Sequence, residues 1–245
     1  MNLALIGYGK MGKEVEAVAK ERGITIAAVF DVEENAGGKG LTRHSLRDVD
    51  VCVDFSTPAA VLENIKAVAL AGKNIVVGTT GWYDRLEDVR TIVKKNHIGL
   101  LYASNFSLGV NVFMKIVENA GRLFDAYEDY DVAVHETHHN KKTDSPSGTA
   151  LSLASIIMRQ VHRKTEILSD ASHGQIKPHQ LHVTSTRVGG VAGRHTILFD
   201  SECDAIELIH TAKNRRGFAL GAVVAAEWLK GKKGVFTMKD VLLPT

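Results

Sequence analysis

One polar stretch of the chain concentrates side chains that carry protons and hold anions. It covers residues 136–149 and includes Glu136, His138, His139, Lys141, Lys142, Ser147, Gly148 and Thr149. A histidine can donate a proton near neutral pH, and a nearby lysine supplies a fixed positive charge for a carboxylate. Ser147 is typical of a helix N-cap, and the free N–H groups that follow it would form a second anion site. The stretch predicts a site for an acidic, reducible substrate. The alternative is a pair of surface histidines beside solvated lysines.

A glycine turn near the start of the chain predicts a dinucleotide site. The turn consists of Gly7, Tyr8, Gly9, Lys10, Met11 and Gly12, between an apolar strand and an amphipathic helix. Gly7 allows a tight turn, Gly9 lets the backbone approach a pyrophosphate, and Gly12 lets the helix and strand pack closely. Asp31 follows 19 residues after Gly12, at the end of the second predicted strand. Its carboxylate can accept hydrogen bonds from both ribose hydroxyls there.

The surroundings of Asp31 also bear on which cofactor is used. A carboxylate repels a 2′-phosphate, and Val32, Glu33 and Glu34 follow it without an adjacent basic residue. Lys10 and Lys39 are the nearest candidate counter-charges. We therefore expect NADH or NADPH as the cofactor, with NADH favoured.

Three further strand ends are expected to line the same crevice. Ligands of an open parallel sheet lie outside the carboxyl ends of its strands. The residues at these ends are Phe55 and Ser56, then Gly78, Thr79 and Thr80, and finally Ser104, Asn105 and Phe106. Ordinary turns are the alternative for the first two groups. The third, within residues 103–111, is interpreted as contacting the nicotinamide, as a hinge, or as both.

Hydrophobic patterning indicates an α/β protein with two domains. Strands are expected at 3–6, 24–30, 49–55, 75–77 and 98–102, alternating with helices at about 10–22, 58–71 and 83–96. This alternation predicts an N-terminal Rossmann-type domain with a parallel sheet. After residue 105 the pattern changes. Helices are expected at 108–124, 148–162 and 217–230 and strands at 131–136, 181–187, 194–199 and 205–211, with 164–180 irregular. Runs of strands predict a C-terminal α+β domain with a mixed or antiparallel sheet.

The domains are assigned from this change of pattern. Residues 1–105 and 215–245 are expected to form the dinucleotide-binding domain, and residues 106–214 the substrate-binding and oligomerisation domain. Residues 187–190 and 193–196 flank a turn and are interpreted as a hairpin with exposed charge. Cys52 and Cys203 are expected in or near the core.

Composition excludes several classes of protein. The 245 residues include 30 Lys and Arg against 28 Asp and Glu, which argues against nucleic-acid or anionic-membrane partners. Neither of the two cysteines has a neighbouring ligand at metal spacing, so no metal site is expected. The N-terminus enters a strand directly, and no apolar run reaches the ~20 residues of a membrane span. We expect a cytoplasmic protein.

These motifs resemble the dihydrodipicolinate reductase family, the 4-hydroxy-tetrahydrodipicolinate reductases of the DapB type. The resemblance runs in order along nearly the whole chain and is most specific in the His-His-x-x-Lys-x-Asp-x-Pro-Ser-Gly-Thr pattern of residues 138–149. It implies NAD(P)H-dependent reduction of (2S,4S)-4-hydroxy-2,3,4,5-tetrahydrodipicolinate to 2,3,4,5-tetrahydrodipicolinate plus water, in lysine biosynthesis by the diaminopimelate pathway. It also implies a homotetramer joined through the sheet of the second domain.

The resemblance further implies roles for individual residues. His138 would donate the proton, His139 would contact the substrate, and Lys142 would hold a substrate carboxylate. Gly148 and Thr149 would bind the other carboxylate. The cofactor would contact the glycine turn and the strand ends described above. Lys10 and Val32 depart from the family pattern, which puts phosphate selectivity in doubt, and Arg194 has no assigned role.

Two alternatives stay open at this point. An amino-acid dehydrogenase of the aspartate or diaminopimelate type shares the two-domain plan but gives no reason for the paired histidines and lysine. A nucleotide-sensing protein without turnover would bind the cofactor and oxidise none of it.

Overall fold

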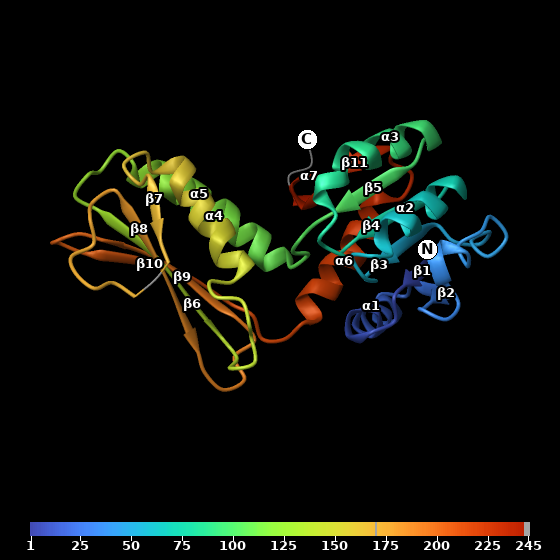
Figure 1. The fold of residues 1–245 in the computed structure, drawn as a ribbon, viewed down its shortest axis with the longest axis horizontal. Coiled ribbons are helices and arrows are strands. Elements are labelled where there is room, and N and C mark those ends of the chain that lie inside the picture. Colours follow the sequence, from blue (N-terminus) through green and yellow to red (C-terminus); the bar gives the residue numbers. More distant parts are fainter. Residues whose placement is uncertain (170, 243–245) are drawn as a thin grey trace. The chain divides into compact units, whose positions relative to one another are not determined.

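The computed structural model describes residues 1–169 and 171–242, which divide into two compact units (Figure 1). The N-terminal unit consists of Met1–Asn111 together with the chain from Arg215 onward, and the C-terminal unit is Val112–Asn214. The first division lies at Asn111, whereas the sequence placed it after residue 105. The side-chain amide of Asn111 donates a hydrogen bond to the carbonyl oxygen of Asn105 at 2.9 Å. This bond ties the start of the connecting helix to the N-terminal unit.

The N-terminal unit is built on a six-stranded parallel sheet with the strand order β11-β5-β4-β3-β1-β2. Its elements are β1 (Asn2–Ile6), α1 (Lys10–Glu21), β2 (Thr25–Phe30), η1 (Ala36–Gly38), β3 (Val51–Asp54), α2 (Val61–Leu70), β4 (Asn74–Val77), η2 (Tyr83–Arg85), α3 (Leu86–Asn96), β5 (Gly99–Tyr102), α6 (Arg216–Leu229), β11 (Gly234–Phe236) and α7 (Met238–Leu242). The predicted Rossmann-type arrangement is confirmed.

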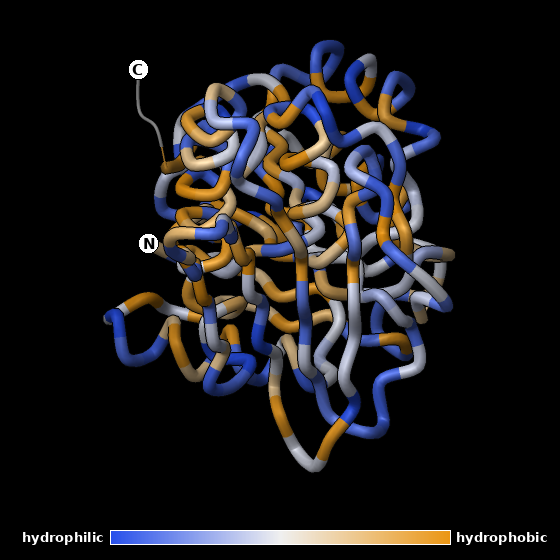
Figure 2. The backbone as a smooth tube through the Cα atoms, turned by 90° about the vertical axis from the view of Figure 1, so that its left-hand side faces the viewer, coloured by the Kyte–Doolittle hydropathy of each residue, from blue (hydrophilic) through white to orange (hydrophobic). Residues whose placement is uncertain are grey.

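Helices cover both faces of this sheet, so alternate strand residues enter two separate cores. Leu3 and Leu5 of β1 pack with α1 and α6, whereas Ala4 and Ile6 pack with α2 and α3. All four side chains are at most 1% exposed. Figure 2 shows hydrophobic and hydrophilic residues alternating along the coils of the helices, as expected where one side of a helix is buried.

The C-terminal unit contains a five-stranded mixed sheet with the order β10-β9-β6-β8-β7. Its elements are β6 (Asp131–His138), α5 (Gly148–Gln160), β7 (Glu166–Leu168), β8 (Gln180–Arg187), β9 (Arg194–Asp200) and β10 (Ala205–Thr211), preceded by the connecting helix α4 (Leu108–Phe124). Strand β6 pairs in parallel with β8 and antiparallel with β9. Helices α4 and α5 pack on one face of the sheet through Val117 and Leu153. The predicted α+β architecture is confirmed.

Several predicted boundaries differ from the structure. The second helix begins at Val61 and not at Pro58, because the backbone first turns through N–H bonds from Ala60 and Val61 to the carbonyl of Thr57. The segment 164–180, expected to be irregular, contains the short edge strand β7. Strand β11 and helix α7 were not predicted. Cys52 is buried as expected, whereas Cys203 is exposed in the turn between β9 and β10, where that prediction is wrong.

No helix within the described ranges has the length and apolar character that crossing a membrane requires.

Candidate active site

The glycine turn has the backbone geometry that a bound pyrophosphate needs. Gly7 adopts a φ of +85°, and a Cβ there would lie 2.5 Å from the carbonyl oxygen of Phe55. A Cβ at Gly12 would lie 2.4 Å from the carbonyl oxygen of Gly7, so helix α1 approaches the turn more closely than an alanine would allow. Gly9 is exposed, and a Cβ there would meet no described atom within 4 Å. The residues therefore fit a dinucleotide phosphate group.

The start of helix α1 faces this open position. Gly9 is its N-cap, and among the described residues no side chain caps it. The first N–H groups of the helix, from Lys10, Met11 and Gly12, thus remain for an anion. The Asp31 carboxylate lies beside the turn, where its Oδ1 accepts the N–H of Tyr8 at 3.3 Å.

Loops from neighbouring strands are fixed against this turn by a buried carboxylate. Asp54, at the end of β3, is 0% exposed and accepts hydrogen bonds from Thr79 at 2.6 Å, Asn64 at 2.8 Å and the Ser56 N–H at 3.0 Å. Burial raises its pKa, and the hydrogen bonds from Thr79 and Ser56 oppose that rise. Asp54 holds the loops after β3 and β4 at adjacent ends of the sheet. This role of Asp54 was not predicted, because its position at a strand end is the only local signal for it.

Aromatic rings pack around the other predicted cofactor residues. The Phe55 ring lies edge-on to Phe106 at 6.0 Å between centroids, and a Cβ at Gly78 would lie 2.1 Å from the Phe55 ring. Thr80 and Ser104 are exposed, whereas Phe106 is 2% exposed. Asn105 accepts the N–H of Ser107 through its side chain, which shapes the turn before α4. All the strand ends named from the sequence therefore follow β1 to β5 of one parallel sheet.

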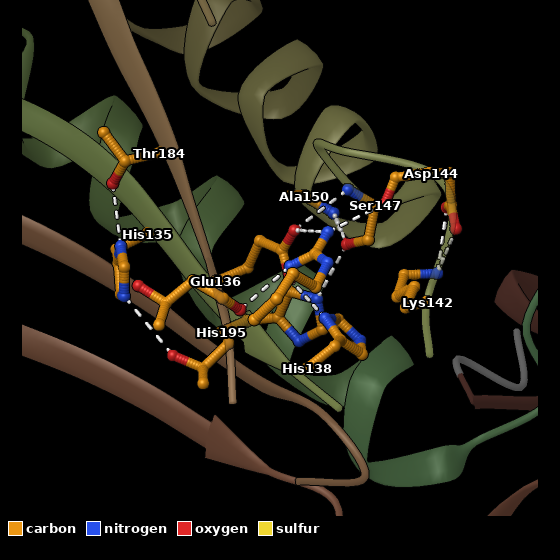
Figure 3. Close-up of polar contacts among 12 residues, drawn as sticks. His135, Glu136, His138, Lys142, Asp144, Ser147, Ala150, Thr184 and His195 are labelled. Atoms are coloured by element: carbon orange, nitrogen blue, oxygen red, sulfur yellow. Dashed lines mark hydrogen bonds and ion pairs between the residues drawn. The ribbon is translucent and has the colours of Figure 1, made fainter. Parts of the chain in front are cut away.

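The second candidate site is centred on Glu136 in the C-terminal unit (Figure 3). Its carboxylate is 0% exposed. One oxygen, Oε1, accepts a guanidinium N–H of Arg187 at 2.7 Å and the backbone N–H of Ser147 at 3.2 Å. The other oxygen, Oε2, contacts Nδ1 of His138. Burial by itself would raise the pKa of Glu136, but Arg187 and His138 lower it to about 2. Glu136 is therefore an anion that joins three separate segments.

His138 and His195 lie together above this carboxylate. Their rings meet edge-on with centroids 5.2 Å apart. His195 is 5% exposed, its Nε2 lies 3.2 Å from the Ser147 hydroxyl, and burial together with His138 lowers its pKa to about 4. His195 is thus neutral at physiological pH. Interpreting 193–196 and 187–190 as a hairpin with exposed charge was wrong, because Arg187 and His195 both point into the buried cluster.

The predicted anion groups lie along the loop and helix that follow β6. Ser147 caps α5 by accepting the Ala150 N–H at 3.2 Å, as predicted, and Gly148 is exposed with open space where a Cβ would stand. Lys142 pairs with Asp144 at 2.6 Å and is 21% exposed. The structure brings His138, Ser147 and Glu136 into direct contact. The Nδ1 atom of His139 is buried without a hydrogen-bond partner among the described residues.

Three side chains of the cluster also have the spacing of metal ligands. Donor atoms of Glu136, His138 and His195 lie within 4.8 Å of one another. The Arg187 guanidinium already neutralises the carboxylate, however, and would repel a dication. The chemistry of the donor set favours a hydrogen-bonded proton network over metal coordination.

Comparisons with known proteins match this arrangement of motifs. The family model described as "Dihydrodipicolinate reductase, N-terminus" matches residues 1–106, and that described as "Dihydrodipicolinate reductase, C-terminus" matches residues 109–242. A 4-hydroxy-tetrahydrodipicolinate reductase of Christiangramia forsetii is 45% identical over 245 residues, which cover 99% of this chain and 98% of the relative. One from Archaeoglobus fulgidus is 38% identical over 262 residues, with 99% and 100% covered.

A solved structure agrees in fold over the same extent. The dipicolinate-bound dihydrodipicolinate reductase from Paenisporosarcina sp. TG-14 is similar with a TM-score of 0.78 and 25% identity, covering 97% of each chain. Two family models that together span nearly all of the sequence, and relatives well above 30% identity over full length, leave one assignment. The chain belongs to the dihydrodipicolinate reductase family.

Proposed function

We propose that this chain reduces (2S,4S)-4-hydroxy-2,3,4,5-tetrahydrodipicolinate to 2,3,4,5-tetrahydrodipicolinate with release of water, using NAD(P)H, in the diaminopimelate route to lysine. The observation that carries the proposal is the buried proton network around His138 in the C-terminal unit, which the same chain combines with the uncapped N–H groups of a glycine turn in its N-terminal unit and with membership of this family. Such a pair of sites suits a substrate that takes up a hydride and a proton.

Different residues of the C-terminal unit are suited to proton donation and to binding the substrate carboxylates. We assign His138 as the proton donor, because its ring is held by a carboxylate and it has an imidazole Nε2 left for the substrate. Lys142 and the N–H groups of Gly148 and Thr149 would hold the two substrate carboxylates, with His139 as a further contact. The Lys142 ammonium now pairs with Asp144, so a substrate carboxylate would have to replace that partner.

The N-terminal unit would hold the cofactor through the residues at the five strand ends. The N–H groups that begin α1 would bind the pyrophosphate, and the Asp31 carboxylate would accept hydrogen bonds from the ribose hydroxyls. When bound, the reduced nicotinamide supplies the hydride that the reduction consumes. NADH is the better cofactor in this proposal, because the Asp31 carboxylate repels a 2′-phosphate and the residues that follow it, Val32, Glu33 and Glu34, bring no adjacent positive charge.

A homotetramer joined through the C-terminal sheet is part of the proposal. The sheet face opposite α4 and α5 carries a cavity of about 440 Å³, lined by side chains that include His135, Thr196 and Leu198. Substituting Leu198→Glu would place a charge in this face and is expected to reduce the mass measured by light scattering. Leu70→Glu, at a residue 65% exposed in α2, is the matched control and is expected to keep the parental mass.

One coupled assay tests the activity itself. Pyruvate and aspartate semialdehyde are combined with the upstream synthase, this protein and NADH, and the absorbance of the reduced nicotinamide is followed. The expected result is oxidation that depends on both substrates and on this protein. Cofactor binding by calorimetry without any oxidation would refute the proposal in favour of a sensing protein. Oxidation of an amino acid with ammonia release would favour a dehydrogenase. The cytoplasmic location and the absence of nucleic-acid and membrane partners stay predictions from composition.

A further inference from the structure

Glu136 occupies a position that no substrate-binding role explains. It is fully buried inside the sheet, two residues in from the end of β6 on the same face as His138. Its two carboxylate oxygens are both used: Oε1 by Arg187 and the Ser147 N–H, and Oε2 by Nδ1 of His138. The carboxylate thus cannot reach a ligand, yet it contacts both the proposed proton donor and the residue that begins the anion-binding helix.

The contact determines which ring nitrogen of His138 carries a hydrogen. An ionised carboxylate only accepts hydrogen bonds, so Nδ1 must be the donor in both protonation states of the imidazole. Nε2 is then the nitrogen that gains and loses the proton. The space in front of Nε2 is kept by a glycine, since a Cβ at Gly193 would lie 2.9 Å from Nε2.

We propose that Glu136 is a positioning residue that fixes the Nδ1–H form of His138, stabilises its imidazolium, and ties it to the start of helix α5 through Ser147. This inference rests on the proposed function, in which the Nε2–H bond of His138 breaks and its proton passes to the substrate as the reduction is completed. The electron pair of that bond stays on the imidazole, which water then reprotonates. Glu136 itself exchanges no proton.

Several other charged or titratable groups surround the His138 ring and determine how much the Glu136 carboxylate matters to it. Arg187 lies on β8, Lys142 lies in the loop after β6, and His195 faces the ring from β9 with His210 beside it on β10. Asp144 offsets the charge of Lys142 by pairing with it at 2.6 Å, Arg187 opposes a positive charge on His138, and neutral His195 supplies no compensating charge. Glu136 is thus the carboxylate in direct contact with the His138 ring.

The Glu136→Gln variant tests this role through the pH profile of turnover. It keeps the shape of the side chain and removes its charge. The alkaline limb of kcat is expected to move down by about 1 pH unit or more, so that turnover falls at least about tenfold at pH 8 and much less at pH 6. A structural role would lower the amount of folded protein without moving that limb. Glu166→Gln is the matched control, because Glu166 pairs with exposed His179 at 3.3 Å in the same unit.

A second measurement uses the unaltered protein and does not depend on a variant that folds. Long-range nitrogen–proton correlation spectra of protein labelled at histidine report which ring nitrogen of neutral His138 bears the hydrogen. The proposal expects Nδ1–H. An Nε2–H form, or an alkaline limb in Glu136→Gln that coincides with the parent, overturns it. A parent without turnover would instead refute the proposed function, while the spectra would still decide the role of Glu136.

Discussion

Acid should destabilise the C-terminal unit through His195, and a single substitution should remove most of that effect. Burial and the neighbouring His138 lower the pKa of His195 from 6.5 to about 4. The unfolded chain therefore takes up a proton at His195 that the folded chain resists. The contribution of neutral His195 is fully present above pH 6.5 and is lost as the pH falls from 6.5 towards 4.

The size of the loss follows from the gap between the two pKa values. A gap of about 2.5 units corresponds to about 3 kcal/mol in the free energy of unfolding, at about 1.4 kcal/mol per unit. At pH 4.5 most of this is already lost, about 2.5 kcal/mol. The His195→Gln variant cannot titrate and keeps an amide near the Ser147 hydroxyl. Its stability should consequently fall by about 2.5 kcal/mol less than that of the parent between pH 7.5 and 4.5.

Urea denaturation at four pH values between 7.5 and 4.5 measures this difference. Circular dichroism reports both units, whereas both tryptophans, Trp82 and Trp228, lie in the N-terminal unit and give a fluorescence reference for it. His173→Gln, at an exposed histidine, is the control and should follow the parent. If the parent and His195→Gln lose stability in parallel down to pH 4.5, then His195 is not buried as a neutral ring and the reasoning fails.

Three other predictions concern turnover and cofactor binding. His138→Gln and Lys142→Ala should each lower kcat by about a hundredfold or more in the coupled assay, the range for loss of a general acid or of charge complementarity. Near-parental turnover in either variant would refute the role assigned to the substituted residue. Gly12→Ala should weaken NADH binding measured by calorimetry at least about tenfold, because its Cβ would lie 2.4 Å from the Gly7 carbonyl oxygen. Unchanged affinity would mean that the turn does not bind the pyrophosphate. Asp31→Asn should raise kcat/KM for NADPH relative to NADH by about tenfold, and an unchanged ratio would show that Asp31 does not discriminate.

The N-terminal unit could be predicted because its signals are local. Each parallel strand is a short buried run, each helix follows a turn, and the residues for the cofactor come directly after strands. The predicted element boundaries were wrong where one local sequence signal is compatible with two backbone structures. Pro58 suits a first helical position, but here it begins a turn that precedes α2. The short elements β11 and α7 have too few residues for a pattern to show.

The C-terminal site was only half predictable. His138, Lys142 and the Ser147 cap lie within one stretch of chain, and their residue types by themselves indicate proton transfer and anion binding. Arg187 and His195 lie more than 45 residues away along the chain, as separations of 51 residues for Arg187–Glu136 and 48 for His195–Ser147 show. Beside glycines in a predicted turn, their charges are typical of an exposed hairpin. Only the pairing of strands reveals that His195 is buried and that Arg187, which is half-buried, contacts Glu136.

Strand register is therefore what assembles the proton network. The parallel pairing of β6 with β8 sets His138 opposite Arg187, and the antiparallel pairing of β6 with β9 sets Glu136 opposite His195. Alternation along β6 places Val134 of the core on the same face as these groups, one pleat further in. A slip of one residue would expel Val134 from the core together with Glu136 and His138. The hydrophobic core thus enforces the register on which the proposed proton donor depends, and substitutions that loosen that core should impair turnover before they unfold the unit.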